Sequence, residues 1–159
     1  MAILDKISET FGKYVAGIIG IALLAVTLIL TINVVGRYCF GQSLTFGEEL
    51  ATYVIIWVTF VGSGVCVQRG IHVSVDAFIN FLPATAKKAM DILGLVVGLV
   101  FSAILCYAGI ILCSQVVGSG QISPAMRMPM VFAYAALPVG TLYMILEYIR
   151  KIIQAFVNG

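Results

Sequence analysis

The chain has 159 residues, of which 62% are hydrophobic and only 10% are charged, and its mean hydropathy is +1.12. A soluble domain carries about 25% charged residues and could not bury this much apolar surface, so the composition indicates an integral membrane protein. The formal net charge of +2 is too small to indicate a nucleic-acid-binding protein.

Four apolar stretches are long enough to cross a bilayer, which takes about 20 residues of helix. They predict an all-α protein with a single four-helix transmembrane domain over residues 1–159. The expected spans are at about 14–37, 46–67, 87–113 and 129–150.

The Lys and Arg residues predict the orientation of these spans. Seven of the nine lie before the first span, between the second and third, or after the fourth, and only Arg37 and Arg127 lie on the other side. Positive charges beside a span are held in the cytoplasm during insertion, so both termini are expected there.

Two further segments have helical periodicity but are too short and too polar to cross the bilayer. The apolar residues at helical spacing are Ile3, Leu4, Ile7 and Phe11 in residues 2–13, and Val75, Phe78, Ile79 and Leu82 in residues 73–82. Both segments are predicted to be amphipathic helices lying in the membrane interface. For residues 2–13, a frayed cytoplasmic tail is an equal alternative.

Local signals mark the ends of the predicted spans. Thr45 and Glu48 have the spacing of a capping box, and the short link before them predicts a tight antiparallel hairpin. Gly41 suits the C-terminal cap of the first span, because glycine tolerates the left-handed conformation. Pro129 suits the first turn of the fourth span, and Pro138 predicts a kink inside it.

The sequence lacks the signatures of catalytic and cofactor sites. An ionisable group in the middle of a span would indicate an ion path or a substrate site, and the predicted spans have none there. His72 is the only histidine, whereas haem held between helices needs a pair of them. No phosphate-binding glycine loop or metalloprotease motif is present. We therefore expect neither an enzyme nor a bound cofactor or metal.

Polar and aromatic residues instead share one face of the second span. Glu49, Tyr53, Trp57 and Gly64 follow one another at steps of four, four and seven. Trp57 lies nearly three turns into the span, too deep for the aromatic belt at a membrane surface. The small residues that begin at Gly62 would let another backbone approach closely, so this face predicts a helix–helix contact.

The two glutamates at the start of this span have different interpretations. Glu48 fits the carboxylate of the capping box. Glu49 is either an acid favoured by the helix dipole or one partner of a specific ion pair. Arg37, at the end of the first span, is the obvious partner within the chain.

A polar pattern also follows the second span. Arg69, His72 and Asp76 are spaced by three and four residues. We expect an interfacial network in which Asp76 orients His72 while Arg69 meets a membrane-lipid phosphate. The alternatives are a metal site, for which two ligands are too few, and a plain stop-transfer charge at Arg69.

These residues, in this order, resemble a known family. The stretch GRYCFGQSLTFGEELATYVIIWVTFVGSGVCVQRGIHVSVDAF from Gly36 is similar to the signature region of the small membrane subunit (DctQ or SiaQ type) of tripartite ATP-independent periplasmic, or TRAP, transporters. The matching elements are Arg37-Tyr38, Ser43, Glu48-Glu49, Tyr53, Trp57, Gly62, Arg69-Gly70, His72, Asp76, Ser123 to Pro129, Tyr134 and Leu137 to Gly140. Many members carry tryptophan shortly before the glutamates, where this chain has Phe46.

The resemblance implies an accessory role in the bacterial inner membrane. A periplasmic binding protein would deliver an organic acid anion, of the sialic acid or C4-dicarboxylate class, to a large membrane subunit that uses sodium to move it inward. This chain would be a scaffold beside that subunit, without a substrate or sodium site of its own. The external loops, residues 38–47 and 114–129, would face the binding protein through Ser43, Ser123 and Arg127.

A different class of function stays open on the residues alone. The chain could be an autonomous four-span protein, either a homo-oligomeric exporter or an anchor of a redox complex. An exporter would need a carboxylate in mid-span, and a redox anchor would need paired histidines.

Overall fold

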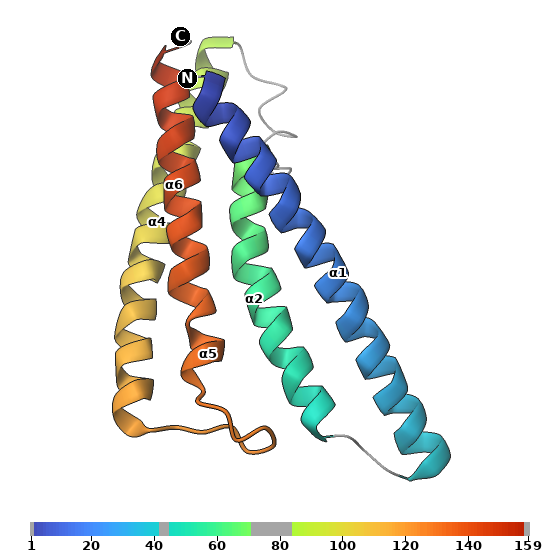
Figure 1. Ribbon diagram of the computed structural model, residues 1–159. Coiled ribbons are helices and arrows are strands. Elements are labelled where there is room, and N and C mark those ends of the chain that lie inside the picture. The colour runs from blue at the N-terminus through green and yellow to red at the C-terminus, as the bar shows by residue number, and fades with distance from the viewer. Residues whose placement is uncertain (1, 42–44, 71–83, 158–159) are drawn as a thin grey trace.

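The computed structural model describes residues 2–41, 45–70 and 84–157, and over these it is helical almost throughout (Figure 1). The helices are α1 (Ala2–Phe40), α2 (Thr45–Arg69), α4 (Ala84–Ser119), α5 (Val131–Tyr134) and α6 (Ala136–Val157). Four stretches are long and apolar enough to cross a membrane: Ser8–Phe40, Thr45–Arg69, Met90–Ser119 and Val131–Val157. The predicted all-α membrane fold with four spans is therefore confirmed.

The four long helices stand in a row instead of closing around a common core. α1 packs on α2, α2 on α6, and α6 on α4 (Figure 1). Burial follows this order, since only 6% of the most apolar window of α1 and 11% of that of α4 are buried, against 22% for α2 and 33% for α6. The row thus has two inner helices, two outer helices and broad apolar surfaces that need lipid or another protein to cover them.

The first helix is longer than expected. The amphipathic residues 2–13 are helical, but they form the beginning of α1 and not a separate interfacial helix, because no proline or turn interrupts the chain before Phe40. The 39 residues of α1 correspond to about 58 Å at 1.5 Å per residue, against a hydrocarbon core of about 30 Å. Away from the chain termini α1 diverges from the row (Figure 1).

At the end opposite the termini, α1 and α4 are each followed by a glycine with positive φ. Gly41 has φ +67° just after α1, which confirms its predicted place at the end of the first span. α4 continues to Ser119, six residues beyond the predicted end at 113, because no breaker comes before Gly120 at φ +61°. The expected external loop 114–129 is accordingly shortened at its start.

The predicted kink of the fourth span is present, slightly before the proline that causes it. Helix α5 ends at Tyr134 and α6 begins at Ala136. Pro138 has no N–H to offer the carbonyl of Tyr134, so the regular bonding pattern is interrupted there. The helix starts at Val131 and not at Pro129, and it continues to Val157, beyond the predicted end at 150.

Glycines let the inner helices approach closely. A Cβ atom added at Gly140 of α6 would lie 2.5 Å from the backbone carbonyl carbon of Phe60 in α2, and one at Gly64 of α2 would overlap the ring of Tyr143 in α6. On the other side of α6, a Cβ at Gly98 of α4 would lie 2.5 Å from the ring of Tyr148. Because glycine has no side chain, these residues set the distances between neighbouring helices in the row, as is common where membrane helices pack.

Candidate functional site

A carboxylate clamp lies at the end of the molecule opposite the termini. Both oxygens of Glu49, in the first turns of α2, are engaged. The hydroxyl of Tyr53 donates a hydrogen bond of 2.7 Å to Oε1, and the backbone N–H groups of Ala125 and Met126 donate bonds of 2.8 and 3.1 Å to Oε2. Bonds to an ionised carboxylate are stronger than bonds between neutral groups. Glu49 therefore ties α2 to the loop between α4 and α5.

That loop has a defined shape of its own. Ser123 is 1% exposed, its N–H bonds to the carbonyl of Met128 at 2.9 Å, and its hydroxyl accepts the N–H of Met126 at 3.2 Å. The N–H of Met130 bonds to the carbonyl of Gln121 at 3.0 Å, which closes the loop at its base. Ser123 thus lies inside the loop, where it fixes the backbone that Glu49 holds.

Arg127 lies exposed on this loop with φ +51°. It is the one non-glycine residue with positive φ in the part of the chain that the structure describes. A left-handed conformation costs an ordinary residue roughly 1–2 kcal/mol. Local strain that persists in a fold is typical of functional positions, so the loop presents Arg127 at some energetic cost.

The neighbouring Glu48 has other partners than those expected. Its Oε1 accepts a hydrogen bond of 3.2 Å from Asn33 in α1, and it lies 3.9 Å from the guanidinium of Arg37. Arg37, named as the candidate partner of Glu49 within the chain, faces Glu48 instead, so the ion-pair interpretation of Glu49 is wrong as far as Arg37 is concerned. Both charged side chains are at least half exposed, so the attraction between them is weak.

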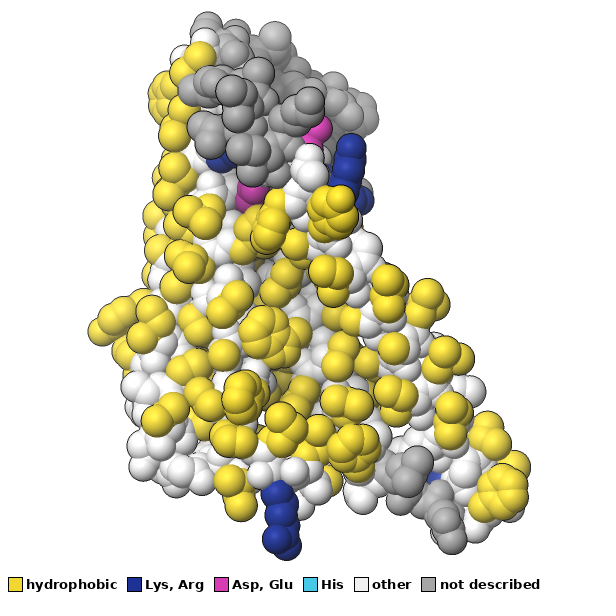
Figure 2. All heavy atoms as spheres, in the orientation of Figure 1, with side chains coloured by type: hydrophobic (Ala, Val, Ile, Leu, Met, Phe, Trp, Pro, Cys, Tyr) yellow, Lys and Arg dark blue, Asp and Glu magenta, His cyan; other side chains and the backbone are white. Residues whose placement is uncertain are grey.

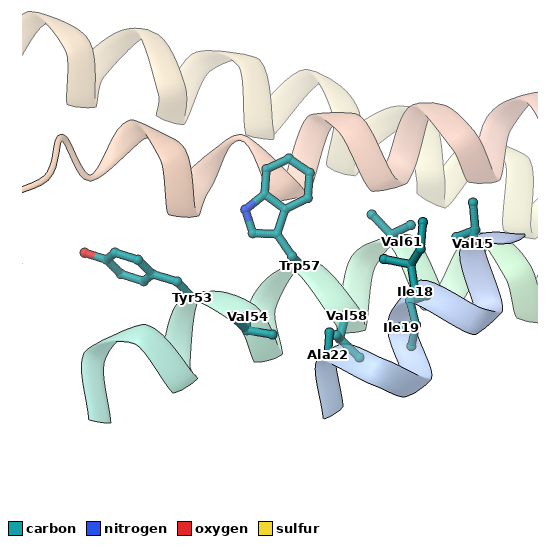
Figure 3. Close-up of a pocket in the computed structure, with 9 residues that line it drawn as sticks. All are labelled: Val15, Ile18, Ile19, Ala22, Tyr53, Val54, Trp57, Val58 and Val61. Atoms are coloured by element: carbon teal, nitrogen blue, oxygen red, sulfur yellow. The ribbon is translucent and has the colours of Figure 1, made fainter. Parts of the chain in front are cut away.

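Trp57 makes its polar contact within the chain. Its indole N–H donates a hydrogen bond of 2.9 Å to the carbonyl of Phe132 in α5, and its ring extends toward α5 and α6 (Figure 3). Phe132 lies in α5, just before the break between α5 and α6, so the indole satisfies a backbone group near the break. The face with Glu49, Trp57 and Gly64 is consequently a seam between α2 and the last part of the chain.

An apolar groove runs along the other side of that seam, between α1 and α2 (Figure 3). Its volume is about 370 Å³. The lining residues are Val15, Ile18, Ile19, Ala22, Tyr53, Val54, Trp57, Val58 and Val61. Gly62 is nearby on α2, and a Cβ there would make an ordinary contact of 3.7 Å with Ile19. The groove therefore offers an apolar surface for packing, and none of its lining residues is charged.

At the end that carries the termini, a buried carboxylate joins three helices. Glu147 of α6 is 5% exposed, and its Oε1 accepts a hydrogen bond of 2.7 Å from the hydroxyl of Ser8 in α1. Its Oε2 accepts one of 2.8 Å from Nε of Arg150. The amide of Gln68 in α2 donates to the hydroxyl of Ser8 at 2.7 Å and also to its backbone carbonyl.

Sequence reasoning missed this network. The sequence signal for it is the spacing of Glu147 and Arg150, three residues apart on one helix, whereas the charge distribution takes Arg150 only as a positive charge after the fourth span. Ser8 and Gln68 carried no signal of their own, since they are distant in sequence from Glu147.

The remaining predicted site residues are divided between exposed and undescribed positions. Arg69 is exposed at the end of α2 and lines a polar hollow with Lys13 and Lys151. Ser43, His72 and Asp76, together with the predicted helix 73–82, lie outside the described residues. Over the described ranges, no three His, Cys, Asp or Glu residues are grouped so as to hold a metal ion.

The fold and these sites define a class of protein. The charged side chains in view gather toward the two ends, and the middle of the surface is apolar (Figure 2). A row of four such helices is a multi-pass membrane protein, in which polar contacts fix the ends of the helices. The family model for the DctQ component of tripartite ATP-independent periplasmic transporters matches residues 10–158, and the chain belongs to this family.

Relatives with assigned roles agree with this. The chain is 29% identical to the ectoine TRAP transporter small permease protein TeaB of Halomonas elongata over 96% of its length and 79% of that protein. It is also 29% identical to the C4-dicarboxylate small permease protein DctQ of Rhodobacter capsulatus, over 69% of this chain and 48% of that one. A third match, at 27% identity, is to the isethionate TRAP permease protein DctMQ of Oleidesulfovibrio alaskensis, covering 74% of this chain and 19% of that protein.

The chain is therefore the small permease subunit of a TRAP transporter, an accessory protein of the inner membrane. Its family works with a large membrane subunit and a periplasmic binding protein, and a transporter subunit of this kind is not a class of enzyme.

Proposed function

We propose that this chain is a rigid scaffold that holds the large subunit during sodium-driven uptake of an organic acid anion. The observation that carries the proposal is the fixing of the row at both ends, by the Glu49 clamp at one and by the Glu147 network at the other. A subunit that braces a moving partner needs such fixed ends. The middle of the row offers the partner mostly apolar side chains and small residues.

The side of α1 is the proposed contact with the large subunit. α1 is an outer helix of the row, and its Leu24, Leu28 and Ile32 side chains are exposed by 69%, 63% and 62%. The apolar groove between α1 and α2 extends this surface. The match to a protein named DctMQ, far longer than this chain, supports a close association of the two membrane parts.

The loop between α4 and α5 is the proposed contact with the binding protein. If both termini are cytoplasmic, as the distribution of Lys and Arg predicts, this loop is periplasmic. Arg127 is exposed on it and would meet the binding protein directly, whereas the buried Ser123 would act by shaping the loop. Ser43, which lies outside the described residues and between α1 and α2 in the sequence, is proposed as part of the same contact.

The proposal is tested by uptake in cells that lack other transporters of this kind. The large subunit and the binding protein encoded with this chain are expressed with or without it, and labelled sialic acid, succinate and ectoine are offered with and without a sodium gradient. We expect sialic acid or succinate, the organic acid anions of the three, to enter only when this chain and sodium are both present. Equal uptake without the chain would refute the scaffold role, and uptake by the chain alone would favour the autonomous exporter.

A further inference from the structure

A polar hollow of about 540 Å³ opens where α1, α2 and α6 meet at the end that carries the termini. Its wall carries four cationic side chains: Lys13 of α1, Arg69 of α2, and Arg150 and Lys151 of α6. Gln68 and Gln154 add amide groups to the same wall. A single water takes up about 30 Å³, so the hollow can hold a group of many atoms.

The surrounding structure positions two of these cations. The buried carboxylate of Glu147 accepts a hydrogen bond of 2.8 Å from Nε of Arg150 and so sets the direction of its guanidinium. The ammonium of Lys151 lies over Gly70, since a Cβ added at that glycine would be 2.9 Å from Nζ. Gly70 also has φ +72°, which an ordinary residue avoids. The backbone at the end of α2 thus leaves room for the lysine head.

The described residues that line the hollow carry more positive than negative groups. Among the described lining residues, four are cationic and Glu9 is the carboxylate, while Glu147 lies buried behind Arg150. Arginine and lysine together suit an oxyanion with several acceptor oxygens, because the guanidinium binds two of them side by side and the ammonium adds charge.

The position of the hollow favours a phosphate that is attached to a lipid. α2 ends at Arg69, so the hollow lies where the apolar spans give way to the polar end of the molecule. Farther along the same helices, Ile18 and Leu146 are exposed by 67% and 59% and offer an apolar surface to acyl chains. Basic pockets between membrane helices are typical sites for acidic headgroups.

We propose that this hollow binds the phosphate group of an anionic phospholipid headgroup. The site concerns the chain itself and does not depend on the scaffold role. A bound headgroup would link α1, α2 and α6 from outside, next to the point where Ser8 and Glu147 link them from inside.

The test compares two double variants of the full 159-residue chain in nanodiscs. K13Q/K151Q removes two cations of the hollow that the Glu147 network does not use. R37Q/R127Q removes two cations from the opposite end and is the matched control. Phosphatidylglycerol bound per chain is measured by native mass spectrometry, in competition with phosphatidylcholine and, separately, with added inorganic phosphate.

We expect the unaltered chain and R37Q/R127Q to retain phosphatidylglycerol in preference to phosphatidylcholine. K13Q/K151Q should bind it about 25-fold more weakly, at about fivefold for each removed cation. Displacement of the lipid only by its own kind supports the lipid source, whereas displacement by millimolar inorganic phosphate would overturn it in favour of a soluble phosphate. Equal retention by all three proteins, or no preference over phosphatidylcholine, would overturn the site itself.

Discussion

The hydrogen bond from Trp57 to Phe132 allows a quantitative test of how α2 holds the broken fourth span. Replacing Trp57 by Phe keeps an aromatic ring but removes the indole N–H, and so leaves the Phe132 carbonyl without this donor. Hydrogen bonds between membrane helices contribute about 0.6 kcal/mol on average and up to about 2 kcal/mol. We expect a value near the upper end, about 1–2 kcal/mol, because the acceptor lies just before the break between α5 and α6.

A double-mutant cycle isolates this bond. In Pro138→Ala the N–H regained at position 138 can bond to the carbonyl of Tyr134, and a regular helix through this region would then supply Phe132 with the N–H of Ala136 as its own donor. Trp57→Phe should then cost less than half as much as it does in the unaltered chain. Unfolding is followed in mild detergent by circular dichroism, because the variant removes the only tryptophan of the chain and with it the fluorescence signal. An equal cost in both backgrounds would refute this account of the break.

Three further predictions concern the clamp, the helix spacing and the exposed loop. Glu49→Lys should lower uptake by the assembled transporter and speed hydrogen exchange in the loop between α4 and α5, whereas Glu48→Gln should do neither; unchanged exchange in the Glu49 variant would mean that the clamp does not order the loop. Gly140→Ala should destabilise the chain by about 1–3 kcal/mol in thermal unfolding, while Gly94→Ala, where nothing lies within 4 Å of an added Cβ, should not; similar melting of the two would show that Phe60 yields easily. Arg127→Gly should leave the melting temperature unchanged or raise it, because left-handed strain is relieved, while binding-protein-dependent uptake falls; normal uptake would remove Arg127 from the proposed contact.

The membrane class and the approximate spans were predictable because they follow from local composition. A run of apolar residues predicts a span whatever the rest of the chain contains. Gly41 likewise predicts a helix end from its own backbone freedom. The kink near Pro138 is also local, since it arises from a missing N–H.

The contacts that fix the ends of the row depend on distant pairs and were not predictable. Glu49 accepts hydrogen bonds from the backbone N–H groups of Ala125 and Met126. Nearly every residue has such an N–H group, so the sequence does not indicate which ones a carboxylate will bind. Ser8 reaches Glu147 across nearly the whole chain. Periodicity places Trp57 and Gly64 on one face of α2, but it does not say that α5 and α6 lie against that face.

The most direct test of the scaffold account is to purify the chain from its native membrane in a gentle detergent and quantify by mass spectrometry what accompanies it. The account predicts one large multi-span protein at near-equal stoichiometry, lost when bulky polar residues replace Leu24 and Leu28 on the exposed face of α1. Recovery of the chain alone, as a stable oligomer of itself, would contradict the account and assign the same face to self-association.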